Sequence, residues 1–352
     1  MNMNQLNNRQ YQIYNYIRSR NSASNKEIRQ YLTDFSNEIS RVTIIRDIEV
    51  LLKNNYIKKI GEGRNIRYAG YTDNFLLKYF NSAEYFKIEP DNRKITENFN
   101  FDIFNQFIEI FTPQELKKLN NLTNEYRKNI ETINPAIYRK EIERLTIELS
   151  WKSSQIEGNT YSLLDTEALI KENREAPGHN REESIMILNH KNALDYIFMN
   201  SDYFQKLDIR KIEDIHRILV DGLSIDFGLR NSLIRITGTK YNPLDNKYQI
   251  QEALEKTVSL INNYSDQFHK AISAIALLSY IQPFIDGNKR TGRLVGNAIL
   301  AAANSCPLSY RSVDSVEYKK AMLLFYEQNS MVYFKELFIQ QYEFSVKNYF
   351  IS

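Results

Sequence analysis

The stretch IQPFIDGNKRTGR, residues 281–293, joins two segments that are predicted as helices, AISAIALLSYI (271–281) and RLVGNAILAAAN (293–304). The first segment is almost wholly apolar and is expected to be the buried centre of an all-α domain. The loop contains two glycines and leads into a helix, where unpaired backbone N–H groups lie beside the positive end of the helix dipole. This arrangement favours an anion.

The side chains of the loop favour the same kind of ligand. Arg290 and Arg293 are three residues apart, so both can lie on one side of the new helix and bind phosphate oxygens. Asp286 offers a hard oxygen ligand for Mg²⁺ beside those phosphates, and Phe284 is expected to anchor the loop in the core. From these residues alone, an ordinary Asp-Gly-Asn turn with solvated arginines stays an open alternative.

Composition indicates an ordinary globular chain of about two domains. Its 352 residues are 42% hydrophobic and 25% charged. The polar start MNMNQLNNRQ contains no secretory signal, and no apolar run is long enough to span a membrane. The single Cys306, expected in the core, excludes an internal disulfide and fits a cytoplasmic protein, and the four histidines lack the spacing of a zinc site.

Residues 1–70 have the pattern of a winged helix-turn-helix domain and an excess of positive charge. They hold twelve Lys/Arg against six Asp/Glu, although the whole chain has a net charge of only +3, which indicates a segment able to bind polyanions. Two helices are expected around Tyr14 and after a Ser24–Glu27 capping box. A third helix is expected to bury Val42, Ile45, Ile48 and Leu52, and two strands, YIKKI and NIRYAG, follow it.

The third helix and the strands are the expected DNA-binding surfaces. The helix offers Arg41, Thr43 and Arg46 to a major groove, with Ile44 and Asp47 on the same outer side. The two strands and their turn, the wing, offer Arg64 and Arg67 to phosphates. Protein binding or dimerisation is the alternative for this module, and assembly into a homo-oligomer stays open.

The rest of the chain is predicted as a linker and helical connector (71–135) followed by a second, mainly helical domain (136–345). Thr112 is expected to cap a helix that has Pro113 at its first position and Glu115 at its third. A further long helix starts at Pro135. The segment LIRITGTKYNP (233–243) has β-branched residues and a glycine, which predict a hairpin.

Residues 282–293 resemble the signature of the Fic (Fic/Doc) family, H-x-F-x-(D/E)-G-N-(G/K)-R-x-x-R. The matching residues are Phe284, Asp286, Gly287, Asn288, Lys289, Arg290 and Arg293, while Gln282 replaces the histidine. Ser153, Glu157 and Gly158, in the region 150–160, are similar to the inhibitory-helix motif (S/T)-x-x-x-E-(G/N) of that family. The region 230–243 resembles its flap hairpin, and a winged helix is a known accessory module of Fic proteins.

Most Fic proteins transfer AMP from ATP to a hydroxyl group of a target protein, and the resemblance implies a role for each matching residue. Asp286 would hold Mg²⁺, and Gly287 to Arg290 would bind the α- and β-phosphates with their backbone N–H groups, helped by the Asn288 and Arg290 side chains. Arg293 would bind the γ-phosphate, and Glu157 would take the place of that phosphate, which is inhibition in cis. The flap residues Ile236, Thr237, Gly238 and Thr239 would hold an unknown protein target by strand addition.

In the family the histidine accepts the proton of the target hydroxyl, and the Gln282 amide has no usable basicity. Loss of a positioned base typically costs about 10²–10⁴-fold in rate. Lys289 is shared with the Doc branch, which phosphorylates, so AMP and phosphoryl transfer both stay open. Three functions follow: a weakened, autoinhibited protein adenylyltransferase; a DNA-binding regulator whose Fic domain senses nucleotide or binds a partner; and an oligomeric scaffold.

Overall fold

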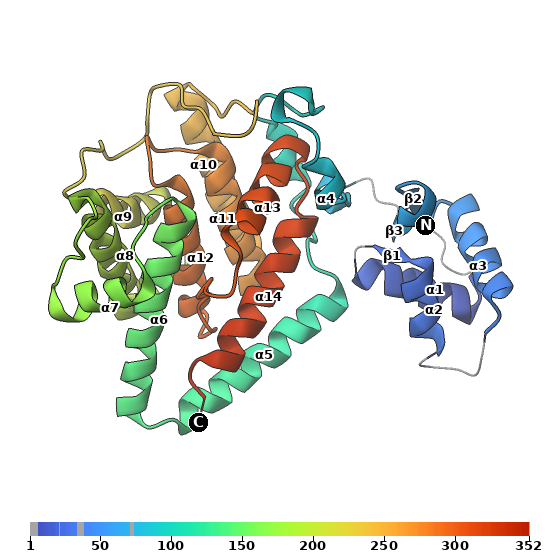
Figure 1. The fold of residues 1–352 in the computed structure, drawn as a ribbon, viewed down its shortest axis with the longest axis horizontal. Helices are drawn as coiled ribbons and strands as arrows, with labels where there is room; N and C mark the ends of the chain where they lie inside the picture. Colours follow the sequence, from blue (N-terminus) through green and yellow to red (C-terminus); the bar gives the residue numbers. More distant parts are fainter. Residues whose placement is uncertain (1–5, 21, 34–38, 71–73, 352) are drawn as a thin grey trace.

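The computed structural model describes residues 6–20, 22–33, 39–70 and 74–351. It is mainly helical, with one small three-stranded antiparallel sheet, which confirms the predicted fold class. Residues before position 71 enclose one hydrophobic core, and residues after it enclose a larger one (Figure 1). Within the described ranges, no helix has the length and apolar character needed to cross a membrane.

Three helices and the sheet form an N-terminal module, residues 6–70. The elements are α1 (Asn8–Ser19), α2 (Asn25–Thr33), α3 (Arg41–Lys53), β1 (Ala23–Ser24), β2 (Ile57–Ile60) and β3 (Arg67–Gly70). Strand β3 is central: Gly70 lies opposite Ile57 of β2, and Tyr68 lies opposite Ala23 of β1. The three predicted helices and two predicted strands are present. Strand β1 was not predicted, because two residues are too few to show an alternating pattern.

Helix α3 buries a different face from the predicted one. Ile44 and Asp47, expected on the outside, are buried together with Ile48, whereas Val42 is 58% exposed. The Asp47 carboxylate accepts hydrogen bonds from side chains of α1, so it is satisfied inside the module. The apolar pattern predicts the wrong face because a paired acidic side chain, Asp47, occupies one of the buried positions.

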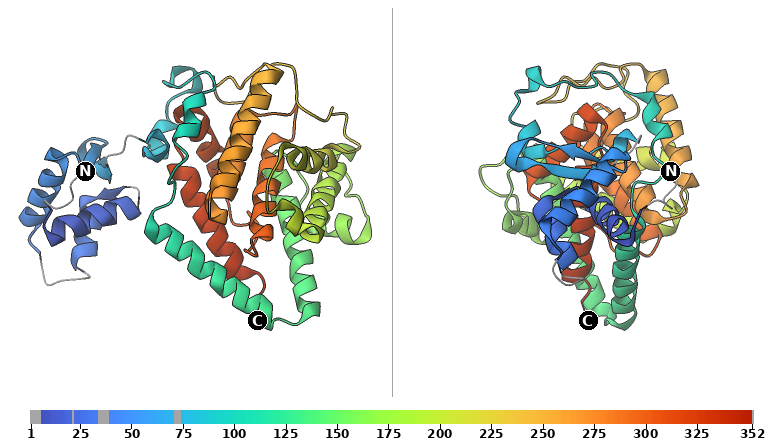
Figure 2. Two further views of the ribbon diagram at one scale, coloured as in Figure 1. Left: turned by 180° about the vertical axis from the view of Figure 1, so that it is seen from behind. Right: turned by 90° about the vertical axis from the view of Figure 1, so that its right-hand side faces the viewer.

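The larger core is built around α11 (Gln267–Ile281) and α12 (Asn288–Ala302), which lie side by side in the middle of the molecule (Figures 1 and 2). Every residue of α11 from Ala271 to Ile281 is buried, as its apolar sequence predicted. The surrounding helices are α5 (Pro113–Thr132), α6 (Pro135–Ile156), α7 (Leu163–Glu172), α8 (Arg181–Met199), α9 (Ile209–Val220), α10 (Lys247–Asn263), α13 (Ser315–Gln328) and α14 (Val332–Asn348).

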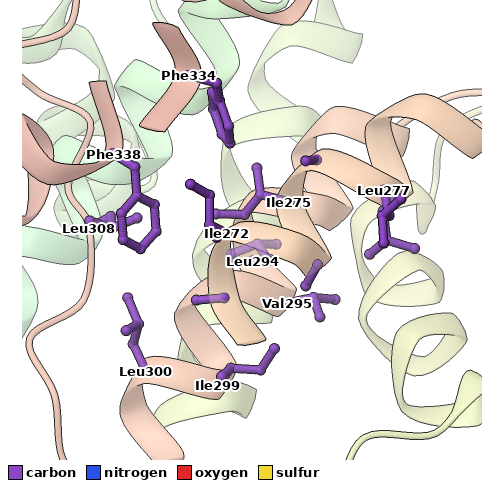
Figure 3. Packing of buried hydrophobic residues seen from close by; sticks show 14 of the residues in the cluster. Ile272, Ile275, Leu277, Leu294, Val295, Ile299, Leu300, Leu308, Phe334 and Phe338 are labelled. Atoms are coloured by element: carbon purple, nitrogen blue, oxygen red, sulfur yellow. The ribbon is translucent and has the colours of Figure 1, made fainter. Parts of the chain in front are cut away.

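Two glycines let α12 approach α11 closely. A Cβ atom built at Gly296 would lie only 2.6 Å from Cγ1 of Ile275, and one built at Gly292 would lie 3.2 Å from the Ile275 carbonyl oxygen. Ile272 and Ile275 of α11 pack beside Leu294 of α12 in the same core (Figure 3). Because the two helices are locked together, the loop that joins them has fixed ends.

The first part of the predicted linker and connector also packs on the larger core; its residues 71–73 lie outside the described ranges. The segment contains α4 (Ser82–Tyr85) and 3₁₀ turns at Phe75–Leu77, Pro90–Asn92 and Phe101–Asn105. Leu76, Ile103 and Phe107 are buried in the core. The predicted capping box at the start of α5 is present, since the Thr112 and Glu115 side chains bond each other's backbone N–H groups.

The segment 230–243, called the flap below, is not the hairpin that the sequence predicted. All of its residues are described; the segment contains neither helix nor strand, has a turn at Thr237 and Gly238, and forms no ladder with itself. One isolated parallel bridge joins Asn242 to Asn98 of the connector. The β-branched residues favoured a strand pair within the segment, but its one bridge is to a distant part of the chain.

Candidate functional site

Hydrogen bonds and ring stacking define the shape of the loop at residues 282–287. Gln282 ends α11 with a left-handed backbone (φ 51°), and Gly287 precedes α12 with φ 78°. The Asn288 side chain closes the loop: its Oδ1 accepts from the Phe284 N–H and its Nδ2 donates to the Phe284 carbonyl, both at 2.8 Å. Phe284 is fully buried, as expected of a loop anchor, and its ring stacks on His216 at 3.7 Å between centroids.

His216 of α9 supports the loop, a role that the sequence did not reveal. Its Nε2 lies 3.0 Å from the Asp286 carbonyl oxygen, a distance at which a protonated Nε2 donates a hydrogen bond. Burial lowers the pKa of His216 to about 4, so the ring is neutral at neutral pH. A histidine within IHRILVDGL was the available signal, but sequence position alone does not show which backbone oxygen a side chain reaches.

The start of α12 has no side-chain cap. The residue before the helix is Gly287, which has no side chain, whereas Asp266 caps α11 by accepting from two backbone N–H groups. The N–H groups in the first turn of α12 therefore lack the acceptor that normally satisfies a helix start. The helix start predicted from the loop is present, and the binding of an anion there stays a prediction.

Arg293 and Glu157, which are 136 residues apart in the chain, are in direct contact. Arg293 is fully buried; its Nη1 donates to Glu157 Oε1 at 2.9 Å, and its other nitrogens donate to the side chain and carbonyl of Ser153, also at 2.9 Å. The second Glu157 oxygen, Oε2, lies 2.6 Å from Lys289 Nζ. Burial would raise the pKa of Glu157, but the charges of Arg293 and Lys289 outweigh it and lower this pKa to about 2.

Gly158, the last residue of the predicted inhibitory motif, follows the end of α6. Glu157 is the C-cap residue of this helix, and Gly158 turns the chain away with φ 104°, a backbone angle that favours glycine. The helix therefore ends where Glu157 reaches the α12 cations. The structure brings Glu157 and Arg293 together as the two motifs suggested, and it adds Ser153 and Lys289 to the same cluster.

Arg290 is buried and only partly satisfied. Its Nη2 donates to Asp286 Oδ2 at 2.9 Å, while Nη1 has no hydrogen-bond partner among the described residues. Burial lowers the pKa of Arg290, but a guanidinium stays protonated at physiological pH. A buried cation with a free N–H donor, next to an uncapped helix start, favours a negatively charged ligand.

Asp286 is the residue to which Mg²⁺ was assigned. Its side chain is 60% exposed and lines the cavity described below. Across the described ranges there is no group of three His, Cys, Asp or Glu side chains that could hold a metal. Mg²⁺ is commonly held by one or two carboxylates with water and substrate phosphates, so Asp286 fits this ion when a phosphate ligand completes the shell.

A cavity of about 480 Å³, within the usual range for small-molecule sites, opens over the loop. Its polar side comes from the loop and the start of α12, and its apolar side comes from α13 and the flap. The lining residues are Ile156, Glu157, Ile234–Thr237, Gln282, Ile285, Asp286, Asn288, Lys289, Tyr318, Lys319, Met322, Leu323 and Tyr326. Of the predicted flap residues, Ile236 and Thr237 line the cavity, whereas Gly238 and Thr239 are not part of its lining.

Both the nitrogen and the oxygen of the Gln282 amide form hydrogen bonds within the protein. Its Nε2 donates to the Ser279 carbonyl at 2.6 Å, and its Oε1 accepts from Asn288 Nδ2 at 3.1 Å. The side chain is buried, with 6% of the residue exposed. Gln282 therefore has a structural role besides its lack of a basic group: its amide stabilises Asn288 and, through Asn288, the loop.

Arg230 links the flap to the loop and was also missed in the sequence. It is buried and donates to the backbone carbonyls of Gln282 and Ser232, each at 2.6 Å, and of Leu244. These acceptors lie at the two ends of the flap and at the start of the loop. Arg230 is the last residue of FGLR and the first of the flap, but nothing in the sequence indicated its contacts with backbone carbonyl groups.

The predicted DNA-contact residues of the N-terminal module differ in accessibility. Arg41, Arg46 and Arg64 are exposed, and Thr43 is half-buried beside the Ser40 cap of α3. Arg67 is engaged inside the module: it pairs with Glu27 at 2.9 Å and donates to the side chain of Ser22 at 2.9 Å. Its assignment as a phosphate contact is therefore not supported by its position.

Known proteins are similar to the part of the chain that contains the loop and the two central helices. A model described as the Fic/DOC family matches residues 206–300. The chain is similar to protein adenylyltransferase Fic of Nematostella vectensis, 31% identical over 192 residues that cover 51% of this chain and 43% of that protein. It is also similar to protein adenylyltransferase fic-1 of Caenorhabditis elegans, with 28% identity, covering 46% of this chain and 33% of the relative. The chain thus spans less than half the length of these relatives.

Solved structures show the same fold. Fic-1 from C. elegans superposes with a TM-score of 0.57 at 21% identity, covering 67% of this chain and 71% of that one. A Fic domain containing signaling protein from Bacteroides thetaiotaomicron superposes with a TM-score of 0.55 at 18% identity, covering 65% of this chain and 94% of the other. The segment 206–300, which contains the loop, α11 and all but the end of α12, is therefore a domain of the Fic/DOC family.

Proposed function

We propose that this chain binds ATP in the cavity over residues 282–293 and is an autoinhibited protein adenylyltransferase weakened by Gln282. The proposal is carried by the Glu157 carboxylate, whose two oxygens lie on Arg293 and Lys289 beside the uncapped start of α12. A phosphate group would seek the same cations. The similarity to adenylyltransferases of other organisms supports the type of reaction.

In the proposed complex the phosphates lie along the start of α12. The α- and β-phosphates accept from the free backbone N–H groups of this turn and from Arg290, whose Nη1 has a donor to spare. The γ-phosphate competes with Glu157 for Arg293. Asp286 would hold Mg²⁺, which when bound neutralises charge on the phosphates.

The proposed reaction is attack by a target hydroxyl oxygen on the α-phosphorus, with loss of pyrophosphate and of the hydroxyl proton. Positioning and the cationic groups favour this step whichever residue is at position 282. The proton lacks an acceptor, because the Gln282 amide is neither basic nor free of hydrogen bonds. Label placed on the α- or γ-phosphate separates AMP transfer from phosphoryl transfer.

The flap offers a place for the target polypeptide. Its residues 234–237 line the cavity, and the backbone groups of residues 233–237 have no hydrogen-bond partner within the described chain. An extended backbone with free N–H and C=O groups can accept another extended chain as an added strand. This edge therefore suits a peptide segment that presents a hydroxyl side chain to the cavity.

ATP affinity and label transfer from α-labelled ATP test the proposal in four versions of the full chain: unaltered, Glu157→Gly, Gln282→His, and both together. Tighter ATP binding after Glu157→Gly and the strongest labelling in the double variant are expected. If all versions bind ATP but none labels protein, the enzymatic part is wrong. If none binds ATP, the nucleotide site itself is wrong.

A second candidate function, DNA-binding regulation by residues 1–70, is favoured by the basic surface of the module. Arg41, Arg46 and Arg64 are exposed, and a cavity of about 260 Å³ between α2 and α3 is lined by Lys26 and Arg29 together with Arg41. Basic side chains grouped around the outer helix of such a module suit phosphate contacts. A gel-shift screen with the full chain, with and without ATP, tests this function.

A further inference from the structure

Arg93 lies in the connector, outside the segment matched by the family, and contacts the tip of the flap. It is 7% exposed, and its Nη1 lies 3.3 Å from both the Gly238 carbonyl oxygen and Oε1 of Glu327 on α13. Its Nε donates to the Ile88 carbonyl at 2.9 Å. One buried guanidinium thus joins three parts of the chain: the connector, the flap and α13.

The Glu327 carboxylate is as buried as the arginine. Glu327 is fully buried, and its Oε2 accepts from the Tyr85 hydroxyl at 2.6 Å. The Arg93 guanidinium also lies over the Phe86 ring, 4.8 Å from its centroid. The buried Glu327 carboxylate is tolerated because it has both a cation and a hydroxyl donor. Removal of Arg93 would leave its charge buried and unpaired, which is costly.

Backbone contacts extend the same attachment along the flap. The Asn242 N–H donates to the Glu97 carbonyl at 2.7 Å, next to the bridge between Asn98 and Asn242. Lys240 Nζ donates to the Asp91 carbonyl at 3.1 Å. Residues 85–98, called the brace below, therefore hold the second half of the flap. The first half, residues 233–237, keeps its backbone unpaired within the described chain.

We propose that Arg93 is a positioning residue for the flap: by holding the Gly238 carbonyl it sets the free edge of residues 233–237 against the cavity. The brace occupies the flap backbone at Asn242, which limits strand addition to the part of the flap that faces the loop. The use of this edge by a target polypeptide rests on the proposed function. The attachment of the flap to the brace does not.

Hydrogen–deuterium exchange of the full chain tests the attachment without any ligand. Arg93→Met keeps much of the side-chain volume but removes every donor, and the Asn242 amide is expected to exchange about tenfold faster or more. Because Arg93→Met leaves Glu327 with an unpaired charge, Arg93→Met/Glu327→Gln is measured beside it. The same acceleration at Asn242 is expected in that variant even where its folding stability is restored.

The matched control is Lys335→Met with Glu115→Gln, which removes another buried cation–carboxylate pair, joined at 2.9 Å on α14 and α5. This control is expected to leave exchange at Asn242 unchanged. Unchanged exchange at Asn242 in both Arg93 variants, or equal acceleration in the control, would overturn the proposal, since the effect would then be absent or global.

A second readout separates positioning of the flap from nucleotide binding. ATP affinity is expected to stay within about twofold in the Arg93→Met/Glu327→Gln variant, because the phosphate site is built by other residues. In a Glu157→Gly/Gln282→His background, transfer to protein is expected to fall about tenfold or more. Equal transfer with faster flap exchange would overturn the positioning role. Absence of ATP binding in the Glu157→Gly chain, where the competing carboxylate is removed, counts against the proposed function and leaves the exchange result intact.

Discussion

At position 282 an amide stands where the Fic signature has an imidazole. The Gln282 side chain donates to Ser279 and accepts from Asn288, so it supports the loop yet offers no group that takes up a proton near neutral pH. The arginines and the helix start do not depend on this residue for their charge. Nucleotide affinity and transfer rate are therefore expected to respond separately to substitution here.

Gln282→His is expected to raise the rate of AMP transfer by about 10²–10⁴-fold, the usual contribution of a positioned base. The measurement is label incorporation from α-labelled ATP in a Glu157→Gly background, where the phosphate site is open. Gln282→Ala serves as the control, because it removes the amide without supplying a base. Equal rates for the histidine and alanine variants would contradict the assignment of this position.

Lys289 is expected to act with Arg293 in holding Glu157, since the two Glu157 oxygens lie on different cations. Glu157→Gly should raise ATP affinity by about tenfold, a typical coupling between competing groups. Lys289→Ala should raise ATP affinity in the chain that has Glu157 and lower it in the Glu157→Gly chain, where Lys289 can only help phosphate. Calorimetry on the four versions gives this cycle. The same direction of change in both backgrounds would argue against joint binding of Glu157 by Lys289 and Arg293.

The ion pairs of Glu157 predict how stability depends on acid. The pKa of Glu157 is lowered from 4.5 to about 2 in the folded chain, so its stabilising effect is complete above about pH 4.5 and is lost as the pH falls toward 2. The difference in unfolding free energy between the unaltered chain and Glu157→Gln should shrink by up to about 3 kcal/mol over this window. Denaturant unfolding at several pH values measures it, and a constant difference would contradict the lowered pKa.

At the scale of elements, the site depends on two helices that are closer than most side chains would permit. Gly296 faces Ile275 at a distance that leaves no room for a Cβ atom, so α12 lies directly against α11. The loop at residues 282–287 joins these two helices and inherits their spacing. A change at this contact is therefore expected to reach the phosphate site without touching it.

Gly296→Ala is expected to destabilise the chain by about 1–3 kcal/mol, the usual cost of overpacking, despite the better helix propensity of alanine. A built Cβ would lie 2.6 Å from Cγ1 of Ile275. Gly296→Ala should therefore cost less stability in an Ile275→Ala background than in the unaltered chain. Denaturant unfolding of the three variants tests this. An additive result would mean that the two positions do not compete for space.

Much of the element order could be predicted, because helix periodicity and caps are local signals. The Thr112 and Glu115 capping box and the buried helix 271–281 are both present. The β-branched residues of the flap favour a hairpin, and local sequence does not reveal that the brace is its partner. The face of α3 was misassigned for a related reason, since Asp47 is buried by contacts from another helix.

The site residues that belong to sequence motifs could be predicted. The residues that act only through tertiary contacts could not. The two Fic-like motifs predict that Glu157 pairs with Arg293, and the structure brings the two side chains together at 2.9 Å. His216, Arg230 and Arg93 act through backbone carbonyl groups, which every residue has, so no sequence pattern marks their partners. The roles given to these residues in ATP binding and transfer stay predictions.

At the scale of the whole molecule, the chain has two parts, each with its own hydrophobic core, and the net charges of the two parts differ. The N-terminal module carries the positive excess of the sequence, whereas the larger core carries the nucleotide site proposed above. The brace follows the module in sequence and ends on the flap. A link between DNA binding and the flap would therefore run through the brace.

Arg41→Ala/Arg46→Ala is expected to weaken DNA binding and to reduce the salt dependence of affinity by about one unit of slope for each phosphate contact removed. The matched control is Arg67→Ala, because Arg67 is already engaged by Glu27 and Ser22. Its salt slope should equal that of the unaltered chain. Titration of a DNA duplex at several salt concentrations gives both slopes, and unchanged affinity of the double variant would remove these residues from the interface.

Glu157 and Arg293 belong to one polypeptide, and this has a consequence for how a competing ligand is sensed. Diluting the protein leaves the local abundance of the blocking carboxylate unchanged, since it is tethered at the end of α6. A freely diffusing triphosphate gains occupancy only as its own amount in solution rises. The ligand concentration that displaces Glu157 is thus a fixed property of the molecule, independent of how many copies a cell makes.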